Sequence, residues 1–250
     1  MKIRILGCGG SFGSPLAWEK NGNIDIKNKR NFRTRSSILI FDKKTTLLID
    51  TSPDLRQQLY DAKCTNIDAV LYTHIHSDHT SGLPDMRSMS LINNKIIPAY
   101  MPSEMKNEIL KNYKYIFFGD KDYRPFMEIK TLEKNFLIND TKINTFKHNH
   151  GAIDAQTFRI GNFAYSTDIK KFYNNDIDKL KNLDLWIVGL LKNETHPSHG
   201  GFYEIMEYIN YLKPKKTIFT HMTALIDEKK INKLCPSNVV VGYDGMEIYL

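Results

Sequence analysis

Four candidate metal ligands lie close together in the first half of the chain. Residues 73–79 read Thr-His-Ile-His-Ser-Asp-His and contain His74, His76, Asp78 and His79. Imidazole nitrogens and carboxylate oxygens are ligands for Zn²⁺, Mn²⁺ and Fe²⁺. Unrelated loop histidines are the alternative, but such a run arises by chance on the order of once in a thousand or less. We therefore predict a metal site here, with Asp78 also a candidate catalytic residue.

This segment offers more ligands than one small cation can hold. His74 and His76 are two residues apart at the end of an extended run, so their side chains project to the same side. Asp78 and His79 follow as the chain turns, and they can reach a second point nearby. Two cations about 3.5–4 Å apart with a shared hydroxide could use all four side chains. Such a centre needs further ligands from distant strand ends, including one that bridges the two cations.

Strands are the commonest predicted elements, and they must position these ligands. The apolar run before His74 is typical of a buried strand, and several other segments are similarly rich in Ile, Val, Leu and Thr. In chain order, the predicted strands are residues 3–6, 37–41, 46–50, 69–73, 96–101, 142–146, 157–160, 163–166, 185–188, 217–220, 239–241 and 247–249.

Predicted helices lie between the strands. Ser52 is expected to cap a helix that has Pro53 in its first turn and Leu55, Leu59 and Ala62 on one face. Ser103 is expected to cap a helix over 104–113. Two further helices are predicted over residues 203–212 and 227–234. Strand-rich halves with interspersed helices indicate an α/β protein of stacked mixed sheets covered by helices.

The run from His74 to His79 resembles the signature of the metallo-β-lactamase superfamily. In that family an Asp ends the preceding strand, as Asp50 does here, and a later His, an Asp and a final His follow in order. The matching residues are His150, Asp168 and His221, each at or just beyond a predicted strand. The resemblance implies one domain over residues 1–250, folded as an αβ/βα four-layer sandwich.

The resemblance also implies roles for these side chains. Asp168 would bridge two divalent cations (Zn²⁺, Mn²⁺ or Fe²⁺), and Asp50 would hold a ligand loop through a hydrogen bond. The remaining six ligands divide into two sets: His74, His76 and His150 for one cation, and Asp78, His79 and His221 for the other.

Other segments resemble the phosphoribosyl 1,2-cyclic phosphate phosphodiesterases of the carbon–phosphorus lyase pathway. They are residues 7–15 (GCGGSFGSP), 82–87 (GLPDMR), 196–199 (HPSH) and 241–248 (VGYDGMEI). Those phosphodiesterases carry a cysteine-rich zinc-binding insertion after the first of these segments. The corresponding residues 18–36 contain no cysteine or histidine here, so we expect that structural zinc to be absent.

Several positions have a second interpretation. His148 competes with His150 for one ligand position, and we favour His150 because Gly151 permits a close backbone turn beside it. His148 would then support a ligand or lie exposed. Asp168 could instead cap a helix that begins at Ile169, and Asp50 could be a simple turn residue.

Two histidines follow too late in the chain to belong to the first cluster. The resemblance assigns His199 to protonating the leaving group or stabilising charge on the phosphoryl group, with His196 as the alternative. The glycine-rich residues 7–15 do not end in Gly-Lys-Ser/Thr. We therefore expect a tight turn near the site rather than a nucleotide-binding loop.

We expect a metal-dependent phosphodiesterase for a small cyclic or diester phosphate metabolite. The net charge of +7 also suits an RNA-processing nuclease of the same superfamily. The lysines are spread along the chain, however, so nucleic acid is not the favoured partner. A metal-binding sensor without turnover is the alternative from another class. No apolar run spans a bilayer and no signal peptide is recognised, so we expect a cytoplasmic protein without a membrane partner. The oligomeric state stays open, a homodimer included.

Overall fold

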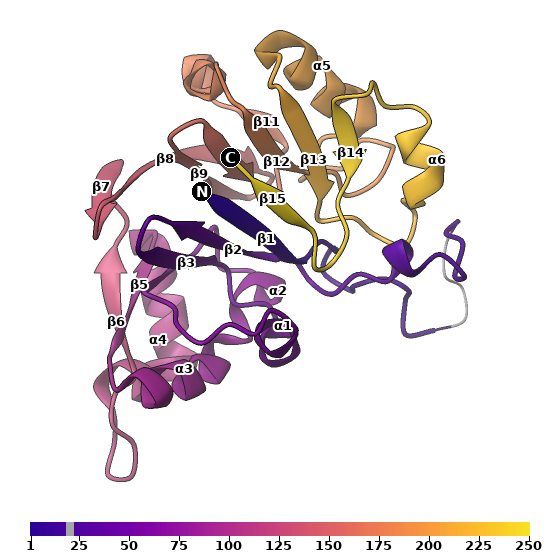
Figure 1. Ribbon diagram of the computed structural model, residues 1–250. Helices are drawn as coiled ribbons and strands as arrows, with labels where there is room; N and C mark the ends of the chain where they lie inside the picture. The colour runs from indigo at the N-terminus through magenta and orange to yellow at the C-terminus, as the bar shows by residue number, and fades with distance from the viewer. Residues whose placement is uncertain (19–22) are drawn as a thin grey trace.

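Two mixed β-sheets pack face to face in the computed structural model, which describes residues 1–18 and 23–250 (Figure 1). The segment 18–36, in which we expect no structural zinc, therefore lies partly outside the described residues. Its remainder contains the short 3₁₀ helix η1 (Lys29–Asn31). The chain ends meet at one sheet edge, where the backbone N–H of Leu250 donates to the carbonyl of Met1 over 2.9 Å.

The first sheet has seven strands in the order β15-β1-β2-β3-β4-β5-β6. Pairing is antiparallel from β15 to β3 and parallel from β3 to β6. The bounds are β1 (Lys2–Gly7), β2 (Ser37–Asp42), β3 (Thr45–Ile49), β4 (Ala69–Leu71), β5 (Ile97–Met101), β6 (Met127–Thr131) and β15 (Glu247–Tyr249).

The second sheet has eight strands, and its central path runs β11-β8-β9-β10-β12-β13-β14, with β7 paired to β8. Strands β10, β12, β13 and β14 are parallel to one another. The bounds are β7 (Asn135–Ile138), β8 (Thr141–His150), β9 (Ile153–Ile160), β10 (Phe163–Ser166), β11 (Lys171–Phe172), β12 (Leu185–Gly189), β13 (Lys216–Thr220) and β14 (Val239–Val241).

Successive side chains along each strand of the first sheet point to opposite faces, and both faces are buried. In β3, Leu47 and Ile49 face the second sheet, whereas Leu48 belongs to the cluster under the helices. In β4, Leu71 faces inward and Val70 outward in the same way. Strands with two buried faces read as continuous apolar runs, which is why they could be predicted from the sequence.

Helices cover the outer faces of both sheets and complete the four layers (Figure 1). Those beside the first sheet are α1 (Leu55–Asp61), α2 (Ser77–Thr80), α3 (Met86–Asn93) and α4 (Ser103–Phe118), with the 3₁₀ helix η2 (Leu83–Asp85). Those beside the second are α5 (Phe202–Leu212) and α6 (Glu228–Asn232), with η3 (Asn174–Leu180). This arrangement is the predicted αβ/βα sandwich. Within the described residues, no helix combines the length and the hydropathy that a membrane span requires.

The structure corrects several local predictions. Strands β6, β7 and β11 and helices α2 and α3 were not predicted. Ser52 does not cap α1, because its hydroxyl accepts from the backbone N–H of Asp54 in the preceding turn. Ser103 is the first residue of α4, and Pro102 occupies the capping position. Asp168 does not cap a helix, since the chain beyond it forms β11.

Candidate metal centre

The predicted ligands meet at one edge of the sandwich because five strands end there. His74 follows β4, Asp168 follows β10, His221 follows β13, and His150 is the last residue of β8. Asp50 directly follows β3. In sheets of this kind, the carboxyl ends of neighbouring parallel strands bring side chains from distant parts of the chain together.

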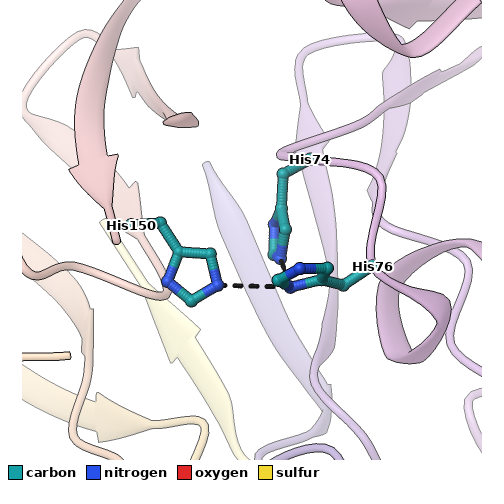
Figure 2. Close-up of side chains that lie close together, drawn as sticks. All are labelled: His74, His76 and His150. Atoms are coloured by element: carbon teal, nitrogen blue, oxygen red, sulfur yellow. Dashed lines mark hydrogen bonds between the residues drawn. The ribbon is translucent and has the colours of Figure 1, made fainter. Parts of the chain in front are cut away.

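One group of three imidazoles comes from both sheets. Nε2 of His74 lies 3.0 Å from Nδ1 of His76, and Nε2 of His150 lies 3.2 Å from the same nitrogen. Figure 2 shows the three rings converging, with His150 reaching across from the second sheet. Three ligands about 2.0–2.1 Å from a tetrahedral zinc would be roughly 3.4 Å apart. The spacing of these nitrogens is close to that value, and the exposed edge of His76 leaves access from solvent.

A second group combines Asp78, His79 and His221. Oδ2 of Asp78 lies 3.4 Å from Nε2 of His79 and 3.2 Å from Nε2 of His221. All three residues are buried. One carboxylate and two imidazoles whose donor atoms lie within 4.8 Å of one another form a second set of ligands for a divalent cation.

Asp168 lies between the two groups and faces both. Its Oδ1 is 3.6 Å from Nε2 of His150 and 3.4 Å from Nε2 of His221, and its Oδ2 is 3.4 Å from Nε2 of His79. The side chain is almost fully buried. A single carboxylate that faces members of both sets has the position that a bridging ligand requires.

Hydrogen bonds fix which ring nitrogens point inward. The Thr73 hydroxyl donates to the Asp50 carboxylate over 2.8 Å, because a carboxylate can only accept. The Thr73 oxygen in turn accepts from Nδ1 of His74. Nδ1 of His79 donates to Asp50 Oδ2, and Nδ1 of His150 donates to the Ser198 carbonyl. In its neutral form, each of these three rings therefore directs an Nε2 lone pair into the site. Burial alone would lower the pKa of His79, but the facing Asp78 and Asp50 carboxylates raise it above its ordinary value.

The donor set fits a pair of cations. Buried Nε2 of His79 has no hydrogen-bond partner among the described residues, and it faces two carboxylates rather than a donor. Nε2 of His74 and Nε2 of His150 both face Nδ1 of His76. A neutral His76 ring has only one N–H, so it cannot donate to both of them. Divalent cations satisfy these lone pairs and neutralise the carboxylates at the same time.

The pKa values of Asp168 and His74 both lie below their ordinary values. Burial alone would raise the pKa of Asp168, but the facing His221 and His79 imidazoles hold it well below its ordinary value. Burial also lowers the pKa of His74, and neighbouring His79 lowers it further. The site therefore presents an ionised carboxylate and a neutral imidazole, which are the forms that bind metals.

Backbone conformation also serves the site. Asp50, Asp168 and His221 adopt the left-handed region, with φ of 62°, 56° and 55°, which non-glycine residues rarely do. Gly189 leaves room for the left-handed turn at Asp168, since a Cβ on residue 189 would lie 2.9 Å from the backbone nitrogen of Asp168. Gly151 similarly admits Ser198, whose carbonyl orients His150.

His199 lies against the cluster and His196 lies further out. The ring of His199 stacks on His221 at 5.5 Å between centroids, and its Nε2 is 3.7 Å from Oδ1 of Asp168. Burial lowers the pKa of His199 to about 3, against the opposing effect of Asp168. His196 is half-buried, and its Nδ1 contacts the Ser198 hydroxyl. Of the two histidines, His199 is therefore the one beside the predicted ligands.

His148 is neither exposed nor part of the cluster of ligands. It is fully buried, with Nε2 2.8 Å from the Thr167 carbonyl and Nδ1 3.0 Å from the Thr157 hydroxyl. Burial lowers its pKa to about 4. The sequence did not identify Thr157 and Thr167, which contact His148, or Thr73 and Ser198, which orient ligands. Thr73, Thr167 and Ser198 each stand next to a predicted ligand or to His199 in the sequence, and this adjacency could have pointed to them.

The glycine-rich turn and the C-terminal motif meet beside the site. The backbone N–H of Gly10 donates to the carbonyl of Met222, next to His221, and Gly13 closes the turn by donating to Gly10. Asp244 accepts from the backbone N–H of Cys8 over 3.1 Å and from that of Thr34 over 2.7 Å. These two segments thus form one support for the end of β13.

Comparison with known proteins identifies related chains. An octanoyltransferase of Porphyromonas gingivalis (strain ATCC BAA-308 / W83) is 29% identical over 255 residues, covering 99% of this chain and 51% of the relative. The chain thus spans about half the length of that curated relative. Among solved structures, a diphosphatase from the PhnP family has a TM-score of 0.89 at 26% identity, covering 99% of this chain and 96% of that one.

More distant structures share the fold alone. Zn²⁺-bound PqqB from Methylobacterium extorquens has a TM-score of 0.82 at 17% identity, with all of both chains covered (100% each). The short form of human tRNase Z has a TM-score of 0.72 at 16% identity, covering 100% of this chain and 99% of that one. A family model described as the beta-lactamase superfamily domain matches residues 45–222. The match spans most of the chain and includes all seven predicted ligands, so the protein belongs to the beta-lactamase superfamily and has the metallo-β-lactamase fold.

Proposed function

We propose that the protein is a dinuclear phosphodiesterase that acts on a small cyclic or diester phosphate. The observation that carries this proposal is the position of Asp168, whose two carboxylate oxygens face ligands of both groups within 3.6 Å. His74, His76 and His150 would hold one cation, and Asp78, His79 and His221 the other. Zn²⁺, Mn²⁺ and Fe²⁺ all accept this set of ligands.

A bound pair of such cations supplies Lewis-acid polarisation of phosphoryl oxygens and lowers the pKa of water. The chain's own residues orient the rings of the predicted ligands and hold them in place. Asp50 and the Ser198 carbonyl keep ring protons off the inward-facing nitrogens. His199 has its ring beside Asp168 and stacked on His221, where it can donate an N–H hydrogen bond to a phosphoryl or leaving-group oxygen.

The comparisons support phosphorus chemistry without naming the substrate. The solved relative at 26% identity is described as a diphosphatase, so a phosphoanhydride belongs beside the phosphodiesters in any substrate panel. The experiment is to load purified protein with Zn²⁺ or Mn²⁺ and measure turnover of bis-p-nitrophenyl phosphate, ribose cyclic phosphate, a 2′,3′-cyclic nucleotide and a dinucleoside diphosphate. Turnover of a phosphodiester supports the proposal, whereas cleavage of the diphosphate alone would replace it with a diphosphatase.

Two other activities have specific observations behind them. The structural likeness to tRNase Z and the net charge of +7 favour an RNA substrate, which predicts tight binding of precursor tRNA with a steep salt dependence. The octanoyltransferase relative favours an acyl substrate, so an octanoyl thioester completes the panel. Inertness of the metal-loaded protein toward every compound would favour a sensor that binds metal without turnover.

A further inference from the structure

A buried hydrogen-bonded relay crosses the second sheet and ends beside Asp168. Nε1 of Trp186 lies 3.0 Å from the Ser166 hydroxyl, which lies 3.0 Å from the Thr157 hydroxyl. That hydroxyl is 3.0 Å from Nδ1 of His148, and Nε2 of His148 is 2.8 Å from the Thr167 carbonyl. All five residues have no exposed surface. They lie on or just beyond the adjacent strands β8, β9, β10 and β12.

The groups at the two ends of the relay have fixed roles. The indole N–H of Trp186 can only donate, and the carbonyl of Thr167 can only accept. Ser166 accepts from the indole and from the Thr157 hydroxyl. His148 donates from Nε2 to the Thr167 carbonyl, while its Nδ1 contacts the Thr157 oxygen. The hydrogen bond to Thr167 therefore requires a proton on Nε2.

The acceptor at the end of the relay belongs to the residue before Asp168. The Thr167 hydroxyl donates to Oδ2 of Asp168, and Asp168 has a left-handed backbone with φ of 56°. A peptide group that precedes such a turn must be held from outside, because local backbone preference opposes the turn. The hydrogen bond from His148 in β8 fixes this peptide group. The last residue of β8 is the predicted ligand His150.

We propose that His148 is a positioning residue that fixes the peptide before Asp168, and that Thr157, supported by Ser166 and Trp186, holds the imidazole ring in place. The role rests on the proposed function, because it sets the geometry of the carboxylate assigned to bridge two cations. It requires no direct contact between His148 and metal. Its consequence is that cation affinity depends on a side chain outside the set of ligands.

The test measures Zn²⁺ affinity by competition with a chromophoric chelator. His148→Met keeps the bulk of the side chain but removes the donor, and it should weaken Zn²⁺ binding about 10–100-fold, as loss of ligand support commonly does. His148→Gln places an amide N–H where Nε2 lies, and it should restore affinity close to wild type. Thr217→Val is the matched control, since the buried Thr217 hydroxyl has no partner among the described residues.

A second measurement covers the case in which His148→Met fails to fold. In the Zn²⁺-loaded wild type, nitrogen NMR of the histidine rings should show His148 protonated on Nε2. Thr157→Val should remove the hydroxyl that contacts Nδ1 of His148 and weaken Zn²⁺ binding, leaving the ligands intact. An Nε2 without a proton, or wild-type Zn²⁺ affinity in folded His148→Met, would overturn the proposal. If the wild type binds Zn²⁺ but cleaves no substrate while the variants keep this order of affinity, the proposed activity fails and the positioning role stands.

Discussion

Oδ2 of Asp50 lies 2.7 Å from Nδ1 of His79, and both side chains are fully buried. The same carboxylate accepts from the backbone N–H and the hydroxyl of Thr73, each over 2.8 Å. Asp50 thus connects the two groups of ligands, through Thr73 to His74 and directly to His79. A residue that binds no cation can in this way determine the orientation of two that would.

Asp50→Ala should weaken metal binding about 10–100-fold, because His79 loses its hydrogen-bond partner and the Thr73 hydroxyl that orients His74 loses its acceptor. The matched control is Asp68→Ala, since Asp68 accepts from the backbone N–H of Thr46 over 2.8 Å at the opposite end of β3. Competition titration with a chelator measures both variants. Equal affinity in the two would show that Asp50 acts on stability alone.

His199→Ala should keep the metal content of the wild type and lower kcat by about 100-fold or more, because it removes a hydrogen-bond donor beside the reacting group. His196→Ala is the matched control, from the same loop but further from Asp168. Metal analysis and steady-state kinetics on the best phosphodiester of the panel measure both effects. A larger loss of turnover in His196→Ala would transfer the role to that residue.

Glu247 gives the fold a pH dependence far from the site. Hydrogen bonding to Lys2 is the main cause that lowers the pKa of Glu247 to about 2, and Arg4 contributes. Because the pKa is depressed in the folded state, the stabilisation is present at neutral pH and is lost as pH falls from about 4.5 toward 2. The pair is exposed, so its contribution stays below about 1 kcal/mol.

Urea unfolding of wild type and Glu247→Gln at pH 7 and pH 3 measures this contribution. The variant should be less stable than wild type at pH 7, and the difference should shrink at pH 3. A difference that grows on acidification would show that Glu247 does not act through its charge.

Much of the site could be predicted from the sequence because its ligands follow apolar strands. Val70 and Leu71 are buried on opposite faces of β4, and the resulting apolar run marks the strand that leads to His74. The elements that were missed lack this signal. Strand β6 has exposed residues at Glu128, Lys130 and Thr131, and α2 is a single turn in which two of the four residues are the predicted ligands Asp78 and His79.

The supporting atoms could not be predicted for a different reason. The carbonyls of Ser198 and Thr167 belong to the backbone, and every residue has one. Only the folded chain shows which carbonyls meet His150 and His148. The same holds for the left-handed turns at Asp50, Asp168 and His221, whose side chains give no local indication of positive φ beyond the ordinary tolerance of Asp.

Metal analysis of Asp168→Ala tests the central claim most directly. After equilibration with Zn²⁺ or Mn²⁺ and removal of free metal, the wild type should retain two cations per chain. Asp168→Ala should lose at least one of them together with all hydrolysis, because both groups share this carboxylate. Two retained cations with wild-type turnover in Asp168→Ala would contradict the dinuclear site proposed for this protein.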